Sequence, residues 1–109
     1  VTKAAAVSFA EWLKITYGNK GIGVSCLCPQ AVRTAMTAQG AGVAGVDGMI
    51  EPEVAAADVL DAIENERFLV TPHAEVLEYV SRKGNDRDRW ISGMQRLQER
   101  YEDWKPGDE

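Results

Sequence analysis

The fold of this chain is decided by the stretch GVSCLCPQAVRT, residues 23–34. Its first half is a nearly continuous apolar run, which is typical of a strand buried on both faces of a parallel sheet. Pro29 ends the run, because proline has no backbone N–H to donate to a neighbouring strand. The stretch therefore predicts a buried strand that passes directly into a loop.

A helix is predicted before this strand and a glycine-rich loop after it. Residues 3–17 carry apolar side chains at steps of three and four, which places them on one face of a helix. Gly18 and Gly21 supply its stop signal. Residues 35–50 contain four glycines among small side chains and show no period, so we predict a mobile loop with room for a short helical turn.

The second half of the chain repeats the alternation of helix and strand. A helix is predicted over residues 52–65, since its leading proline suits the first helical position. Residues 68–70 are a short strand candidate, and a third helix is predicted over residues 71–83. Residues 86–104 are highly charged, with apolar side chains at helical spacing, and predict an amphipathic helix.

The order of these elements is half of an alternating α/β pattern. It predicts an α/β, Rossmann-like fold, which is a doubly wound parallel sheet, with this chain as its C-terminal portion only. Two short strands make a poor sheet by themselves, so further strands are expected upstream, and Val1 is interpreted as a cut N-terminus. Residues 1–83 are assigned to this domain, and residues 84–109 to a charged amphipathic helical extension.

Composition and charge argue against several classes of function. The net charge of −5 argues against a nucleic-acid binder, which needs clustered Lys and Arg. No apolar run approaches the ~20 residues of a membrane span, so no membrane partner is expected. The two cysteines, Cys26 and Cys28, fit a reduced, cytoplasmic protein, and no metal site is predicted because further ligands are not nearby.

Three features together resemble the C-terminal part of the short-chain dehydrogenase/reductase family. VTKAAA, residues 1–6, is similar to the end of the Tyr-x-x-x-Lys segment of that family and places the motif lysine at Lys3. An alanine-rich helix follows, as in the family. PQAVRT, residues 29–34, stands in the place of Pro-Gly-x-x-x-Thr, with Gln30 as a departure from the usual glycine. The resemblance covers roughly two thirds of the chain.

The resemblance implies an NAD(P)-dependent oxidoreductase that acts on a small-molecule alcohol or carbonyl substrate, with NAD or NADP as its cofactor. Lys3 would be catalytic, through the pKa of the motif tyrosine, and would also bind the nicotinamide ribose. Pro29, Val32 and Thr34 would bind the cofactor, the last two at the nicotinamide carboxamide. The tyrosine would lie four residues before Lys3, outside these 109 residues, so the chain alone is expected to be inactive.

Simpler explanations stand beside these roles. Lys3 is also compatible with a solvated lysine at a frayed helix end, and Thr34 with a helix cap or a turn residue. His73, the single histidine, follows a proline at a predicted helix start, which favours a surface position. Cys26 and Cys28 share one face of the strand and are interpreted as buried apolar residues.

A function of a different class also stays open, namely a small non-catalytic interaction or regulatory α/β module. Such a module is expected to begin with its own capped element and to bury its own core. The apolar residues Val7, Trp12 and Ile15 lie off the main stripe of the first helix. This second apolar face predicts a homo-oligomer.

Overall fold

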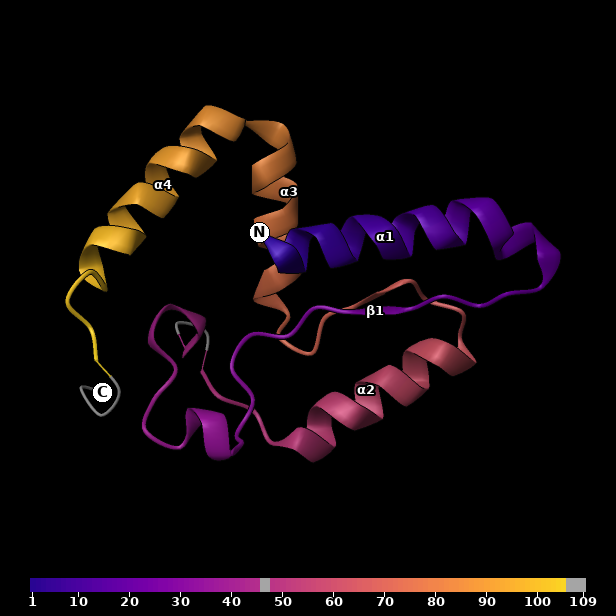
Figure 1. Ribbon diagram of the computed structural model, residues 1–109, viewed down its shortest axis with the longest axis horizontal. Helices are drawn as coiled ribbons and strands as arrows, with labels where there is room; N and C mark the ends of the chain where they lie inside the picture. Colours follow the sequence, from indigo (N-terminus) through magenta and orange to yellow (C-terminus); the bar gives the residue numbers. More distant parts are fainter. Residues whose placement is uncertain (46–47, 106–109) are drawn as a thin grey trace.

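The computed structural model describes residues 1–45 and 48–105 and is mostly helical (Figure 1). Two positions of the predicted loop, 46 and 47, and the last four positions of the predicted extension, 106–109, lie outside this description. The elements in chain order are α1 (Thr2–Tyr17), η1 (Gly18–Lys20), β1 (Cys26–Leu27), η2 (Ala35–Thr37), η3 (Gly42–Gly45), α2 (Pro52–Glu64), β2 (Leu69–Val70), α3 (Glu75–Asn85) and α4 (Arg87–Arg100).

The first helix confirms the periodicity of the sequence. α1 runs over 16 residues and passes into the short helix η1, and Gly21 then adopts φ +85°, a left-handed conformation that glycine tolerates best. None of the side chains of α1 is buried. Leu13 and Tyr17 on its apolar stripe are half-buried, whereas Phe9 is 60% exposed, so the stripe is only partly covered in the described structure.

The sheet consists of two strands that lie parallel to each other. Cys26 is opposite Leu69 and Leu27 is opposite Val70. Cys26 donates its N–H to Phe68 O at 2.6 Å, and Cys28 donates to Val70 O at 2.8 Å. α2 lies between β1 and β2 in the chain and packs against β2. The unit is therefore one strand–helix–strand crossover with a sheet of minimal size.

The prediction of a Rossmann-like, doubly wound parallel sheet is wrong for this chain. The sheet has two strands of two residues each, and the described part is a small helical domain. The physical reason lies in the sequence between the strands. Pro29 and the glycines after it interrupt extended backbone, and the remaining apolar segments have the 3.6-residue period of helices, so β1 has only β2 to pair with.

The residues of α2 that the structure buries are small. Proline at the first helical position is confirmed, but the buried residues are Ala55 and Ala62, whereas Leu60 and Ile63 are 69% and 58% exposed. Two strands of two residues offer a narrow surface. A helix placed on such a surface contacts it through small residues two turns apart, and its larger apolar side chains project past the edges.

The last two helices extend away from the sheet and form an arch (Figure 1). α3 begins at Glu75 and not at the predicted Thr71, because residues 71–74 form turns after β2. α4 begins after Asp86, whose carboxylate accepts the backbone N–H of Arg89 at 3.1 Å. This is an N-cap interaction, and it fixes the boundary between α3 and α4.

The hydrophobic core is small. Among the described residues, the buried apolar side chains are Ala31, Ala55, Ala62 and Val70. The Cα radius of gyration is 15.8 Å, against about 13 Å for a compact domain of 100 residues. The helices are thus spread around the sheet and leave much apolar surface in contact with water. No described helix is both long and apolar enough to cross a bilayer.

Candidate cofactor-binding site

The loop predicted to bind the cofactor, Pro29–Thr34, starts directly after the carboxyl end of β1. Ala31 within it is 3% exposed, so the middle of the loop is anchored in the core. The loop is also joined to the segment before α2 by an isolated parallel bridge between Val32 and Ile50. Arg33 donates its N–H to Ile50 O at 2.8 Å, and Ile50 donates to Ala31 O at 3.1 Å. The backbone of the loop is therefore held from two sides.

An ion pair on the surface joins the same two segments, the loop and the residues before α2. Arg33 Nε lies 2.7 Å from Glu51 Oε1, and both side chains are more than half exposed. Pairs this exposed contribute little to stability, with a median of about 0–1 kcal/mol. The backbone bridge between Val32 and Ile50, and not the ion pair, holds the two ends of the predicted loop together.

Thr34 is the N-cap of the short helix η2. Its backbone N–H donates to Thr37 Oγ1 at 2.9 Å, and Thr37 returns its own backbone N–H to Thr34 O at 3.1 Å. Thr37 Oγ1 also donates to Val32 O at 2.7 Å. The capping alternative considered for Thr34 is thus correct, and Thr37 is a positioning residue that the sequence did not single out. A Thr three residues after a Thr is the signal of a short capping box.

Two polar groups of this loop remain for a ligand. Within the described residues, no acceptor is found for the backbone N–H of Val32, which is only half-buried. Thr34 is exposed, and its hydroxyl takes part in the capping box with Thr37, whose Oγ1 lies 3.5 Å away. A carboxamide offers one carbonyl acceptor and one NH₂ donor, which match an N–H and a hydroxyl. The loop thus presents one donor and one group that can accept, the two kinds of partner that a carboxamide requires.

The other two predicted site residues, Pro29 and Lys3, are both exposed. Pro29 lies at the start of the loop, and Lys3 lies on the first turn of α1. In Figure 1 the chain runs along α1 and returns through β1, so the start of α1 and the end of β1 face the same side of the view. Within the described residues, no hydrogen bond or ion pair joins Lys3 to the loop.

His73 is the residue whose position the sequence mispredicted. It is 3% exposed and not on the surface. Its Nδ1 accepts the backbone N–H of Gln30 at 3.0 Å, and its Nε2 lies 3.1 Å from Gly48 O. These partners are 43 and 25 residues away in the chain. The residues next to His73 in the sequence could therefore not predict its burial, because its partners are distant in the chain.

Cys26 in β1 and Cys28 directly after it lie on the same side of the chain, as predicted, with their Sγ atoms 3.9 Å apart. Both are free thiols and only partly buried, so the expectation of buried apolar cysteines is too strong. Burial, with smaller contributions from the charge and the hydrogen bond of Cys26, raises the pKa of the Cys28 thiol to about 11. A raised pKa keeps the thiol protonated at neutral pH, which argues against a role as nucleophile.

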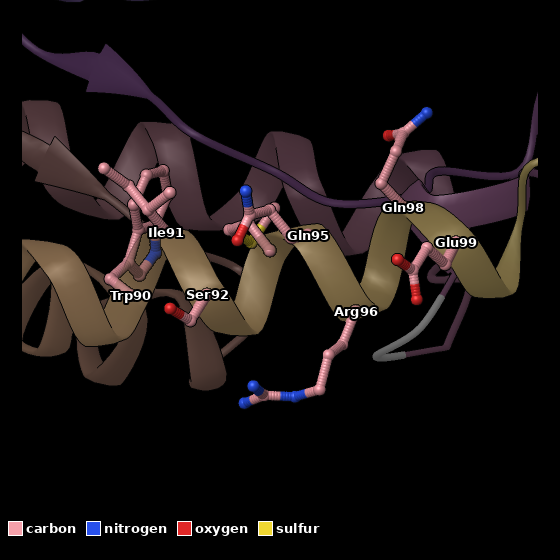
Figure 2. Close-up of a pocket in the computed structure, with 8 residues that line it drawn as sticks. Trp90, Ile91, Ser92, Gln95, Arg96, Gln98 and Glu99 are labelled. Carbon is pink, nitrogen blue, oxygen red and sulfur yellow. The ribbon is translucent and has the colours of Figure 1, made fainter.

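A shallow hollow also runs along α4, far along the chain from the loop. Figure 2 shows that its side chains point in different directions, with Arg96 extending to one side of the helix and Gln98 to the other. One helix surface with diverging side chains does not enclose a ligand. We therefore place the site at the loop and not here. The hollow is lined by Trp90, Ile91, Ser92, Met94, Gln95, Arg96, Gln98 and Glu99.

Comparisons with models of protein families, with curated proteins and with solved structures gave no match for this chain.

Proposed function

We propose that this chain supplies the lysine and the nicotinamide-binding loop of an NAD(P)-dependent oxidoreductase that is similar to the short-chain dehydrogenases. The proposal rests mainly on the loop Pro29–Thr34. It follows the carboxyl end of a parallel strand, which is where ligands of parallel sheets bind. There it offers the N–H of Val32 and the hydroxyl of Thr34, a donor and an acceptor suited to a carboxamide.

The proposed reaction interconverts an alcohol and a carbonyl. A nicotinamide cofactor supplies or accepts the hydride when it is bound. Val32 and Thr34 would orient its carboxamide, Pro29 would contact it at the start of the loop, and Lys3 would bind the ribose hydroxyls. The substrate would contact residues 35–45, which follow the loop directly.

The proton would pass through a tyrosine one helical turn before Lys3, outside these 109 residues. Tyrosine and lysine four positions apart share one face of a helix. The ammonium of Lys3 would favour the phenolate and lower the pKa of that tyrosine from its ordinary value of about 10. The chain would therefore contribute positioning and electrostatic stabilisation, and the residues before it the proton donor.

The test compares the 109-residue chain with a longer form of the protein in which a tyrosine stands four residues before Lys3. We expect the longer protein to bind NADH or NADPH and to reduce members of a panel of ketones and aldehydes. We expect no turnover by the 109-residue chain, because the loss of a single stabilising donor costs about 3–4 kcal/mol and several are missing. Turnover by the short chain, or a longer protein that binds neither cofactor, would contradict the proposal.

A second candidate is a non-catalytic interaction module, and one observation favours it. The side chains of Phe9, Trp12 and Ile15 on α1 are 60%, 51% and 81% exposed. Exposed apolar surface of this kind marks protein contacts. A longer protein without affinity for nicotinamide cofactors, together with a chain that stays a folded monomer at high micromolar concentration, would favour this candidate over the oxidoreductase.

A further inference from the structure

His73 joins three segments that are distant in the sequence. It follows β2, its Nδ1 faces Gln30 in the loop after β1, and its Nε2 faces Gly48 in the segment before α2. The side chain is almost fully buried, at 3% exposure. A buried polar ring is stable only when its nitrogens are hydrogen-bonded, and both are.

The two hydrogen bonds define the state of the ring. Because Nδ1 accepts the N–H of Gln30, it carries no proton. The proton of the neutral ring is then on Nε2, which donates to Gly48 O. A ring protonated on both nitrogens has no acceptor for Gln30, so this arrangement requires the neutral Nε2–H tautomer.

The ring connects the loop after β1 to the segment before α2 through its two hydrogen bonds. Gln30 lies two residues before Val32 and four before Thr34, in the loop proposed to hold the carboxamide. Gly48 lies two residues before Ile50, which pairs with Val32. An apolar side chain would fill the same space but would fix neither backbone group. Two directional hydrogen bonds from one rigid ring set the distance between the segments as well as the orientation of the Gln30 peptide.

We propose that His73 is a positioning residue that holds the Gln30 peptide, and through it the N–H of Val32 and the hydroxyl of Thr34, in the orientation that binds nicotinamide. This inference rests on the proposed function. It assigns the Gln30 hydrogen bond to cofactor binding, whereas the Gly48 hydrogen bond holds the backbone directly before α2. The hydrogen bond of Nδ1 and the hydrogen bond of Nε2 can therefore be tested separately.

Two variants each keep one of the two hydrogen bonds of His73 and remove the other. In His73→Asn the amide oxygen takes the place of Nδ1 and still accepts from Gln30, whereas the Gly48 bond is lost. In His73→Gln the amide nitrogen takes the place of Nε2 and still donates to Gly48, whereas the Gln30 bond is lost. Each variant loses one buried hydrogen bond, so both are expected to lower the thermal unfolding midpoint by similar amounts.

The readout is the Kd for NADH and NADPH of the longer protein described above. We expect His73→Gln to raise this Kd at least tenfold and His73→Asn to leave it within threefold of the wild type. A purely structural role predicts parallel changes in both variants and overturns the proposal, as does an unchanged Kd in His73→Gln. If the wild type binds neither cofactor, the proposed function fails and the role of His73 toward the cofactor fails with it.

A second measurement tests the geometry independently of function. In the 109-residue chain, ¹⁵N NMR is expected to show a protonated Nε2 and an unprotonated Nδ1 in His73, and slow hydrogen exchange of the Gln30 amide. His73→Gln is expected to accelerate exchange at Gln30, and His73→Asn to leave it slow. A proton on Nδ1, or fast exchange at Gln30 in the wild type, would show that Nδ1 does not accept the N–H of Gln30 and would overturn the proposal.

Discussion

The indole ring of Trp104 lies directly against Gly42. This contact joins the segment after α4 to the loop between β1 and α2. A Cβ added to Gly42 would lie 3.2 Å from Trp104 Cε3, closer than ordinary van der Waals contact. Gly42 also has φ +58°, a left-handed conformation. Trp104 Nε1 is buried here without a hydrogen-bond partner among the described residues. The contact thus depends on a glycine for both space and backbone conformation.

Gly42→Ala is expected to destabilise the chain by about 2 kcal/mol, because it combines a left-handed alanine with crowding of the indole. Gly21→Ala is the matched control. Gly21 has φ +85° but nothing within 4 Å of an added Cβ, so its alanine adds backbone strain alone, about 1 kcal/mol. Chemical denaturation measures both. In a Trp104→Ala background the two substitutions should cost the same, and equal costs in the wild type would contradict the contact.

Residues 35–41 are expected to exchange their amide hydrogens quickly, as a substrate lid would, whereas the two ends of the loop stay protected. Protection at Arg33 and Ile50 follows from their backbone hydrogen bonds of 2.8 and 3.1 Å. Hydrogen exchange with mass spectrometry resolves the difference, and in the longer protein bound cofactor and substrate should slow the loop. Strong protection throughout residues 35–41 without ligand would argue against a lid.

Local patterns in the sequence were sufficient for the first two helices. The three- and four-residue spacing of α1 and the leading proline of α2 each report on their own helix, and both predictions are confirmed. These signals need no knowledge of distant residues. Thr34 is also held by a local interaction, with Thr37, but the sequence offered this cap only as an alternative to the cofactor role and did not point to Thr37.

Properties set by distant residues were not accessible in this way. An apolar run predicts a strand but not how many strands will pair with it, so the two-stranded sheet was missed. The burial of His73 depends on backbone groups of Gln30 and Gly48, which arrive from other parts of the chain. The exposure of Leu60 likewise depends on how narrow the sheet is, which no helical period encodes.

Cys28 is expected to react slowly with alkylating reagents at neutral pH. Burial raises the pKa of its thiol to about 11, so at pH 8 the thiolate is at least tenfold scarcer than for a free thiol. Mass spectrometry after iodoacetamide treatment gives the rate, with Cys26→Ser as a variant that removes the neighbouring charge and thiol. Alkylation as fast as that of an unfolded peptide would contradict the raised pKa.

The same shift predicts a loss of stability at alkaline pH. The native state keeps the Cys28 proton to higher pH than the unfolded state, so between pH 9 and about 11 the native state binds more protons. The free energy of unfolding therefore falls as pH rises through this window. It should fall less steeply in Cys28→Ala, and denaturation curves at pH 8 and 10.5 compare the slopes.

In the longer protein Lys3→Ala is expected to lower kcat more than Thr34→Ala. Lys3 would act on both the tyrosine and the ribose, whereas Thr34 would orient the carboxamide alone. We expect at least a hundredfold loss for Lys3→Ala, equivalent to about 2.8 kcal/mol of transition-state stabilisation, and a tenfold loss for Thr34→Ala. The pH–rate profile of Lys3→Ala should also move to higher pH, and an unmoved profile would refute the electrostatic role of the lysine.

The exposed face of α1 is expected to make the chain self-associate. Phe9 and Trp12 stack with ring centroids 6.0 Å apart, and with Ile15 they form one continuous apolar surface on the helix. Full burial of side chains of this size stabilises a contact by about 1.5–3 kcal/mol each. A symmetric contact between two copies of α1 buries the surface twice, so micromolar association is expected. Sedimentation at several concentrations measures this association.

Trp12→Glu should raise the dissociation constant at least tenfold, whereas Leu60→Glu, on the exposed side of α2, should leave it unchanged. A wild-type monomer at high micromolar concentration would contradict the prediction, and equal weakening by both substitutions would move the contact away from α1.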